Sequence, residues 1–385
     1  MDGTINQCVG IDISKSTFTG CICKRSVTGQ ETYGGVADFT NSNQGYNQLM
    51  RWSRKHADTS LPLIFAMEAT GVYYEGLAYH LFRLNQRVAV ILPNKVKHFG
   101  KSINIKTKTD VVDARIIARM GVERQLDQWQ PPAPIFKKLR DLTRLYADLK
   151  KERTTFTNRL KASEAGASPL PFIINANNSI IKGIESQLVK CEKEIKTLIY
   201  SEDWLAAKVE KILSIKGVGL ITIAIIVAET QGFALIKNAK QLASYAGYDI
   251  VLRESGTSVK GKTRISKKGN SRIRAALHFP ALVSARFNQD LKSCYDRINI
   301  NKASKMIGAT ALQRKILLLI YALWKKDELF IEDYKITSKD QSLNIACSPG
   351  NRVAEIKVGR PIDLPTQDEH SNDESPEVLL RVLQI

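Results

Sequence analysis

Residues 7–16 read QCVGIDISKS, a mostly apolar run that ends in an acidic residue and a small polar turn. Residues 7–13 predict a buried strand, and Asp12 lies at its end. The segments that follow predict a mixed α/β layout with a central sheet. We expect further strands over 17–23, 32–39, 63–67 and 87–92, a helix capped by Asn41, and a helix from Val72 to Leu84.

Four acidic residues of this region stand where they could converge. Asp12 and Glu68 end two predicted strands, and functional groups in open α/β sheets lie at the carboxyl ends of strands. Asp110 and Asp113 are three residues apart on a predicted helix, so both carboxylates share one face. Four oxygen ligands suit Mg²⁺ or Mn²⁺ and not zinc, and pairs of such ions serve phosphoryl transfer. The alternative for the helical pair is an ordinary solvated face.

The chain is strongly basic. Its 385 residues include 57 Lys and Arg against 38 Asp and Glu, which gives a formal net charge of +19. Such an excess attracts polyanions, most often nucleic acid, because neutralised phosphates release condensed counterions. A membrane surface is the rival partner, but there is no uninterrupted apolar run of about 18 residues and no signal-peptide pattern at the N-terminus. We therefore expect a cytoplasmic protein that binds DNA and no membrane.

Lysines cluster just before the helix that carries Asp110. Residues 93–108 hold five lysines and no acid, and we expect a mobile basic loop there. Thr109 follows this loop and offers a side-chain oxygen that could cap a helix over 110–123.

The pattern changes to heptads in the middle of the chain. Apolar residues recur at alternating steps of three and four over 136–160 and again over 181–198. This spacing predicts two helices with an apolar stripe each, and the Gly, Ser and Pro residues of 165–171 break the run between them. We expect the two helices to form an antiparallel coiled-coil hairpin or to pair with another subunit, with contacts in a dimer or tetramer. The alternative is a spacer that packs on itself.

The next region, 204–330, predicts a mostly helical unit with two candidate phosphate-binding features. Gly217 and Gly219 flank a turn of helix–hairpin–helix type, where backbone amides could approach phosphate; the alternative is a plain turn between packed helices. Residues 257–274 contain seven bases, no acid and no aromatic residue, which favours phosphate contacts over base stacking, although a solvated basic face is the simpler alternative. The seven bases are Lys260, Lys262, Arg264, Lys267, Lys268, Arg272 and Arg274.

Three motifs of the first part resemble those of the RuvC and RNase H-like nucleases, in the branch of the DEDD transposases. They are IDIS at 11–14, MEATGVYYEGLAYHL at 67–81 and KTDVVDARIIA at 108–118. That branch includes Piv-type DNA invertases and the bridge-RNA-guided recombinases of insertion sequences. The neighbouring Glu75 is an alternative to Glu68, but it lies two turns into the helix. The resemblance implies that four residues bind metal and act in catalysis: Asp12, Glu68, Asp110 and Asp113.

A fourth stretch, 241–277, resembles the C-terminal transposase domain of the same family. There a serine followed by glycine, shortly after an Ala-Gly turn, is the nucleophile, which implies Ser255 after the turn at 246–247. The family commonly has a proline where this chain has residues 249–250, so the approach to the serine differs. A serine hydroxyl needs an activator, and we expect the metal site to serve, within one chain or across subunits. His278 is the nearest histidine, and we expect it to be structural.

These observations predict an α/β RNase H-like (RuvC-like) domain, coiled-coil helices and a mainly α-helical C-terminal domain. The tail lacks periodicity and turns acidic, which predicts disorder, or a shield for the basic surface. The expected parts are a RuvC-like DEDD domain at 1–134, a coiled-coil hairpin at 135–203, a transposase domain with the serine at 204–335, and an acidic tail at 336–385.

The function expected from the residues and the resemblance together is that of an insertion-sequence transposase or site-specific DNA recombinase. It would cleave and rejoin strands through a phosphoserine intermediate, with Mg²⁺ or Mn²⁺ as cofactor. The resemblance also implies a structured guide RNA as a partner. The main alternative is a metal-dependent, structure-specific DNA nuclease that uses water and needs no serine. A non-catalytic nucleic-acid scaffold is the third reading, although clustered carboxylates would oppose DNA binding.

Overall fold

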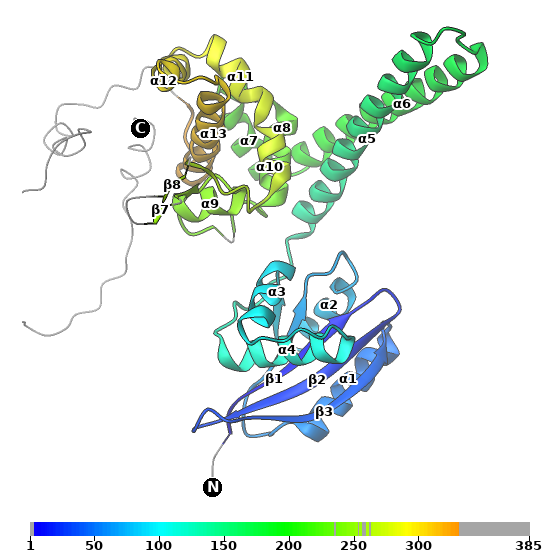
Figure 1. The fold of residues 1–385 in the computed structure, drawn as a ribbon, viewed down its shortest axis with the longest axis vertical. Helices are drawn as coiled ribbons and strands as arrows, with labels where there is room; N and C mark the ends of the chain where they lie inside the picture. The colour runs from blue at the N-terminus through cyan, green and yellow to red at the C-terminus, as the bar shows by residue number, and fades with distance from the viewer. Residues whose placement is uncertain (1–3, 235, 253, 256–258, 262, 331–385) are drawn as a thin grey trace, which may run out of the picture. The chain divides into compact units, whose positions relative to one another are not determined.

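The computed structural model describes residues 4–234, 236–252, 254–255, 259–261 and 263–330. The chain divides into two compact units, residues 1–131 and 132–385, and each is described by itself below. Figure 1 shows a unit built around a sheet in the first part of the chain and a helical unit in the second. The predicted acidic tail at 336–385 lies outside the described residues.

A five-stranded mixed sheet forms the centre of the first unit. Its strand order is β3-β2-β1-β4-β5, with β1, β2 and β3 antiparallel and β4 and β5 parallel to β1. The strands are β1 (Thr4–Ile13), β2 (Thr17–Ser26), β3 (Glu31–Thr40), β4 (Leu63–Glu68) and β5 (Arg87–Ile91). The predicted mixed α/β layout is therefore confirmed, and each expected strand is present.

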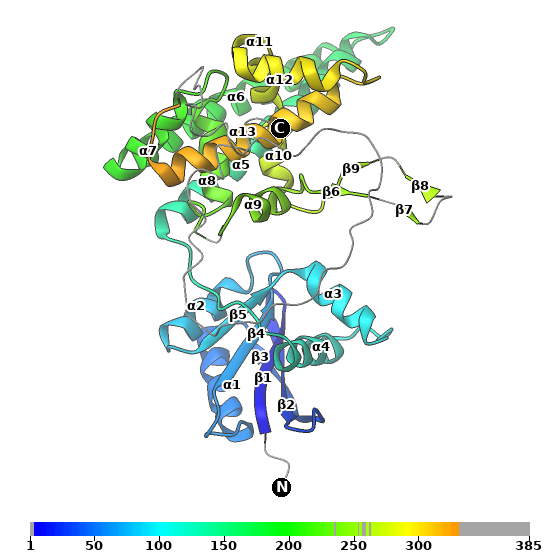
Figure 2. The same cartoon turned by 90° about the vertical axis from the view of Figure 1, so that its left-hand side faces the viewer.

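Helices cover both faces of this sheet, as Figure 2 shows. Two helices pack with one face in a common apolar core, and the other two pack with the opposite face. The first pair is α1 (Asn43–His56) and α2 (Glu75–Arg83), and the second pair is α3 (Pro93–Ser102) and α4 (Asp110–Glu123). Glycine lets α4 lie close to the central strand, because a Cβ on Gly10 would stand 2.1 Å from the backbone nitrogen of Ala118.

Three local predictions for this unit are wrong. Ser42, and not Asn41, caps α1, because its side chain accepts a hydrogen bond from a first-turn amide. The helix predicted from Val72 begins at Glu75, after a turn. Much of the expected mobile basic loop is helical, since α3 covers 93–102 with a proline in its first turn and a buried apolar side.

A helical hairpin begins the second unit. It is made of α5 (Pro134–Glu164) and α6 (Pro171–Tyr200), which pack along each other as Figure 1 shows. The buried side chains lie mainly toward the end that joins the rest of the unit, as at Leu139, Leu188 and Ile195. Side chains near the far end, such as Phe172, are exposed. The heptad positions therefore form two helices whose shared core thins along the hairpin.

Short helices around a long one complete the second unit. The central α13 (Met306–Lys326) has fully buried side chains at Leu312, Ile316 and Ile320. The surrounding helices are α7 (Asp203–Leu213), α8 (Leu220–Glu229), α9 (Ala239–Ala246), α10 (Ser271–Ala276), α11 (His278–Phe287) and α12 (Gln289–Asn299). Two short antiparallel pairs lie between α9 and α10 in the sequence: β6 (Ile250–Val251) with β9 (Arg264–Ile265), and β7 (Glu254–Ser255) with β8 (Val259–Lys260).

The apolar character of α13 bears on the expectation, made from the sequence, that the chain has no segment able to span a membrane. Among the described helices, α13 is the one long and apolar enough to cross a membrane by length and composition. Most of its apolar stretch, 67%, is buried inside the second unit, where it forms part of the core. Burial in a core explains a continuous apolar helix without a membrane.

Candidate functional site

The four predicted carboxylates come from three elements of the first unit. β1 and β4 run parallel, with Ile11 aligned with Met67, so Asp12 and Glu68 are the next residues at the same edge of the sheet. Asp110 is the first residue of α4, and Asp113 lies in the same first turn. The Thr109 hydroxyl caps that turn by accepting from an amide at 3.2 Å, as predicted.

Asp12 is electrostatically coupled to the other three acids. The pKa of Asp12 is raised to about 6, mainly by partial burial and then by the charges of Asp113, Asp110 and Glu68, in that order of effect. Burial also raises the pKa of Asp113; Lys108 opposes this rise and Asp110 adds to it. The structure therefore brings the other three carboxylates close enough to Asp12 to disfavour its negative charge. Repulsion of this kind is relieved by a cation or by protonation.

The donor chemistry of this carboxylate site fits a hard divalent cation. Carboxylate oxygens are the ligands that Mg²⁺ and Mn²⁺ prefer, and the mutual repulsion here is what such a cation would neutralise. Within the described residues, no three His, Cys, Asp or Glu side chains already stand in a metal-binding arrangement. The carboxylates are therefore near enough to interact electrostatically, but their side chains would have to move before they could coordinate one ion together.

Asn41 connects the loops that follow two of these acids. Its amide nitrogen donates to the carbonyl of Ser14 at 2.9 Å and to that of Tyr73 at 3.1 Å. Its amide oxygen accepts from the Tyr46 hydroxyl at 2.6 Å. The sequence suggested only a helix cap at this position. Nothing in the local pattern signals the real partners, which lie 27 and 32 residues away.

The predicted nucleophile lies in the second unit. Ser255 is in β7, and its backbone is aligned with Val259 of β8. Figure 2 shows the β7/β8 pair farther from α9 and α10 than the β6/β9 pair. The glycine that follows Ser255 lies outside the described residues. We refer to residues 250–265 as the serine ribbon.

The root of the serine ribbon is tightly hydrogen bonded. The Ser266 amide donates to the Asp249 carbonyl at 2.8 Å, and the Ser266 hydroxyl donates to its carboxylate at 2.6 Å. Asp249 is one of the two positions where the family commonly has a proline, and here it is hydrogen bonded to Ser266 at the other end of the ribbon. Gly247 ends α9 with φ +76°, and a Cβ there would lie 2.8 Å from a guanidinium nitrogen of Arg274.

The seven basic residues predicted to contact nucleic acid differ in exposure and in their contacts within the second unit. Arg264, Lys267 and Lys268 are exposed. Arg272 lies 4.0 Å from carboxylates of Glu229 and Asp148, and Arg274 donates to the Ala246 carbonyl at 2.7 Å, so both make contacts within the unit. The side chain of Lys260 and all of Lys262 lie outside the described part of the chain.

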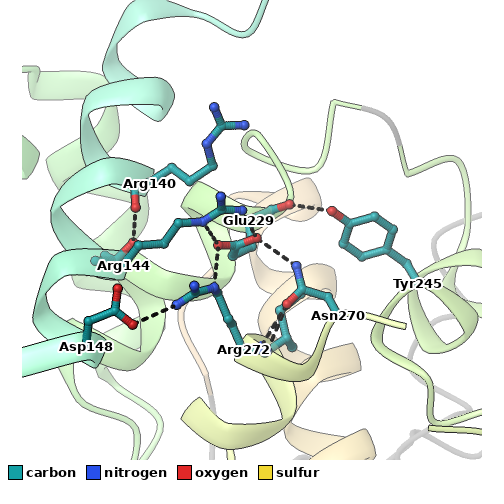
Figure 3. Close-up of polar contacts among 9 residues, drawn as sticks. Arg140, Arg144, Asp148, Glu229, Tyr245, Asn270 and Arg272 are labelled. Carbon is teal, nitrogen blue, oxygen red and sulfur yellow. Dashed lines mark hydrogen bonds and ion pairs between the residues drawn. The ribbon is translucent and has the colours of Figure 1, made fainter. Parts of the chain in front are cut away.

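A buried carboxylate that the sequence did not single out joins the hairpin to the segment after the ribbon (Figure 3). Glu229, at the end of α8, has a side chain only 4% exposed. Arg144 of α5 donates to both of its oxygens, at 2.8 and 3.1 Å. The Asn270 amide donates to it at 2.7 Å and also caps α10. Burial by itself would raise the pKa of Glu229, but these hydrogen bonds and the nearby Arg144 and Arg272 charges hold it below its usual value.

The glycine turn at 217–219 has the expected shape. Gly217 has φ +95°, and a Cβ there would lie 2.7 Å from the Ser284 hydroxyl, which itself donates to the Lys216 carbonyl. Gly219 precedes α8 and has open space around it. This geometry leaves the amino end of α8 accessible.

Comparisons with known proteins fall on these same stretches. A family model described as "Transposase", of the DEDD and IS110 type, matches residues 9–163. The model described as "Transposase IS116/IS110/IS902 family" matches residues 209–296. Pilin gene-inverting proteins of Moraxella bovis and Moraxella lacunata are each 27% identical over 324 residues, which is 84% of this chain and 97% of each relative.

The two matches share one family and together cover more than half of the chain. The first contains the four carboxylates, and the second contains Ser255 and the buried Glu229. The inverting proteins extend the similarity through the helical hairpin between them. The chain therefore belongs to the IS110-type transposase family, whose members include site-specific recombinases, and it is a DNA transposase or recombinase.

Proposed function

We propose that this enzyme cuts and rejoins DNA through a covalent phosphoserine at Ser255. The serine oxygen attacks a phosphodiester, a serine–phosphate bond forms, and the bond from phosphorus to one sugar oxygen breaks. That sugar leaves as a hydroxyl after taking up a proton. A hydroxyl from another strand then attacks the phosphoserine and restores the serine. Each step exchanges one phosphoester bond for another, so no nucleotide triphosphate is consumed.

Asp12, Glu68, Asp110 and Asp113 would hold Mg²⁺ or Mn²⁺ in this reaction. When bound, such a cation stabilises negative charge on the phosphate and on the attacking and leaving oxygens. The carboxylates position the ion, and the fixed strand ends and the capped first turn of α4 position the carboxylates. The observation that carries the proposal is that one chain has both a coupled carboxylate site and a separate basic serine ribbon, in the stretches matched by the two transposase models.

Trapping of a covalent DNA adduct tests the proposal. Wild-type protein with labelled substrate DNA should give a species that survives denaturation, and Ser255→Ala should not. Ser271→Ala is the matched control, because it removes an exposed serine hydroxyl from the same basic segment. An adduct that persists in Ser255→Ala would show that the nucleophile is another residue.

A second candidate function is hydrolytic cleavage of branched DNA by the carboxylate site alone. The coupling of Asp12 to three other acids favours it, because that observation does not involve Ser255. Product analysis separates the two functions. Cut ends without rejoined strands, unchanged in Ser255→Ala, would support hydrolysis. Recombinant products lost in Ser255→Ala support strand exchange.

Nucleic-acid partners are proposed on the same basis. Exposed basic side chains such as those of Arg264, Lys267 and Lys268 would contact DNA or a structured guide RNA. The net charge of +19 supports binding to either. Sequencing of RNA that co-purifies with the protein tests the guide. A single enriched species would support it, and random cellular RNA would contradict it.

We also propose that the active form is a dimer or tetramer whose hairpins contact one another. The exposed apolar side chains of Leu170, Phe172 and Ile173 near the hairpin turn support this proposal. In that assembly the carboxylates and the serine ribbon would act on the same phosphodiester, and an isolated monomer should be inactive.

A further inference from the structure

A short turn follows the strand that carries Glu68. It spans residues 70–74, between β4 and α2, and it exposes two large apolar side chains. Val72 is 65% exposed and Tyr73 is 42% exposed. Single apolar residues at a surface are common, so exposure alone says little. The way the turn is held says more.

Hydrogen bonds connect this turn to both strand ends of the carboxylate site. The Thr70 hydroxyl donates to a carboxylate oxygen of Glu68 at 3.2 Å. The Asn41 amide donates to the carbonyl of Tyr73 and, through its other hydrogen, to the loop two residues after Asp12. The exposed side chains are therefore fixed relative to two of the acids that would surround a scissile phosphate.

The backbone of the turn also orients the aromatic ring. Gly71 has φ +57°, and the Tyr73 ring lies 3.8 Å from where a Cβ on Gly71 would stand. The Tyr73 amide donates back to the Thr70 carbonyl at 3.4 Å. The Tyr73 ring thus lies against the backbone of the turn, and this packing limits its movement.

The charge of the site indicates what this ring could contact. The carboxylates by themselves repel a phosphate backbone and would attract it only through a bound cation, so a contact beside them that adds to the cation's is expected to involve uncharged parts of the DNA. Base faces are uncharged and stack on aromatic side chains regardless of sequence. Apolar side chains next to such a ring can enter a base step and separate its bases.

We propose that Tyr73 stacks on an unpaired DNA base next to the phosphodiester addressed by the carboxylates, with Val72 against the neighbouring base and Asn41 as the positioning residue. The proposal rests on the proposed function, because it needs DNA at the carboxylate site. Its ligand is an unstacked base of single-stranded or distorted DNA.

Photo-cross-linking tests the contact with a defined probe. The probe is a single-stranded thymidine oligonucleotide in which 5-iododeoxyuridine replaces some thymidines, mixed with the full-length protein. Light of long ultraviolet wavelength joins that base to an aromatic ring stacked on it, and mass spectrometry of the peptides locates the link. We expect a cross-link at Tyr73. Tyr33 is the internal control, because it has the same exposed fraction, 42%, on strand β3.

Substitutions then measure what the ring contributes. Tyr73→Ala should weaken binding of the oligonucleotide by about five-fold to a hundred-fold, the usual range for loss of one stacked base. Tyr73→Phe keeps the ring and should bind like wild type. Neither variant should differ from wild type in its affinity for an oligonucleotide of the same length that has the sugar-phosphate backbone but no bases. Tyr33→Ala should leave both affinities unchanged.

The role of Asn41 is separated from general stability by a pair of variants. Asn41→Asp has the same shape but cannot donate to the two carbonyls, so it should lose the cross-link at Tyr73 while circular dichroism shows a folded protein. Tyr46→Phe removes only the hydrogen bond to the Asn41 oxygen. It should retain most of the cross-link.

Three results would overturn the proposal. Cross-links elsewhere in residues 4–131 but none at Tyr73 would refute the base contact while leaving the recombinase function intact. Stronger cross-linking of the matching uridine RNA would assign the turn to RNA. If wild-type protein bound no DNA of any kind, both this proposal and the proposed function would fail.

Discussion

The side chain of Asp12 reports on the charges of its neighbours. Its raised pKa arises from partial burial and from three acids that come from another strand and from a helix. The Glu229 carboxylate is the opposite case, because two arginines and an asparagine hold its pKa down despite burial. Asp12 lies among like charges, which suits a cation site. Glu229 lies among positive charges and hydrogen-bond donors, which suits a structural anchor.

Replacement of Asp12 by asparagine should stabilise the cation-free protein near neutral pH. The pKa of Asp12 is raised in the folded state to about 6, so its favourable contribution is present below pH 4 and is lost as the pH rises through 6. After allowance for solvent screening, the difference is on the order of 1–2 kcal/mol. Urea unfolding at pH 4 and pH 7 with a chelator measures it.

The same variant should abolish DNA cleavage while it gains stability. Ser14→Ala serves as a control, because it changes a nearby exposed residue without changing charge. Equal dependence of unfolding on pH in wild type and Asp12→Asn would contradict the electrostatic coupling.

Replacement of Glu229 by glutamine should destabilise the second unit. Breaking a buried ion pair costs about 3–5 kcal/mol, and because the Arg144 side chain is 42% exposed we expect about 2–3 kcal/mol. The pKa of Glu229 is lowered on folding, so its contribution is present above the ordinary carboxyl range and is lost as the pH falls through the folded value. Thermal unfolding between pH 3.5 and 7 should show this loss in wild type and not in the variant.

Glu194→Gln, an exposed change on α6, is the matched control for Glu229 and should shift neither the midpoint nor its dependence on pH. A Glu229→Gln protein as stable as wild type at pH 7 would show that the hairpin does not depend on this anchor.

The elements of the first unit show which features the sequence makes predictable. The strands were found because apolar runs end in polar turns, and the cap of α4 was found because Thr109 precedes a helical pattern. Helix α3 was missed because five lysines in its neighbourhood suggested a loop, although Val96 and Phe99 pack inward. Long-range contacts decide such a segment, and they are not visible in a window of charges.

A pair of glycines tests how closely α4 must lie against β1. Gly10→Ala would place a methyl group 2.1 Å from a backbone nitrogen of α4, which only a shift of the helix could relieve. We expect a loss of roughly 3 kcal/mol or more, at the upper end of overpacking effects. Gly183→Ala lies on α6 with open space around it and should stabilise by about 0.5–1 kcal/mol.

Chemical denaturation of both variants gives this comparison directly. If Gly10→Ala unfolds at the wild-type denaturant concentration, the close approach of α4 to β1 is not required for stability.

The two units together show how much of a site can be inferred from a single sequence. The carboxylates were predictable because strand ends and helix spacing place acids by local rules. Ser255 came mostly from the resemblance, with its basic neighbourhood as the other argument, since a loop serine by itself carries little local signal. Glu229 was missed, although a lone acid ending the apolar helix α8 indicates a buried partner, because Arg144 lies 85 residues away. Residues far apart in the chain are joined only by tertiary packing.

Self-association of the full chain should depend on the end of the hairpin. Phe172 is 77% exposed there, and Phe172→Glu should weaken association at least ten-fold, because a buried phenyl ring contributes about 1.5–3 kcal/mol. Light scattering over a range of concentrations measures the change. Val27→Glu, at a position in the first unit that is 68% exposed, should not alter it. Unchanged association of Phe172→Glu would place the subunit contact elsewhere.

The amino end of α4 has a consequence for the order of folding and ion uptake. Asp110 and Asp113 lie where the helix dipole is positive and where Thr109 already satisfies an amide, so the helix itself favours their negative charge. The core beside it is formed by buried apolar side chains such as Phe99 and Ile117. The site is thus assembled by the fold, in contrast to small zinc domains that collapse when the metal is withdrawn. An ion bound at these carboxylates would then exchange between reaction cycles without unfolding of the domain.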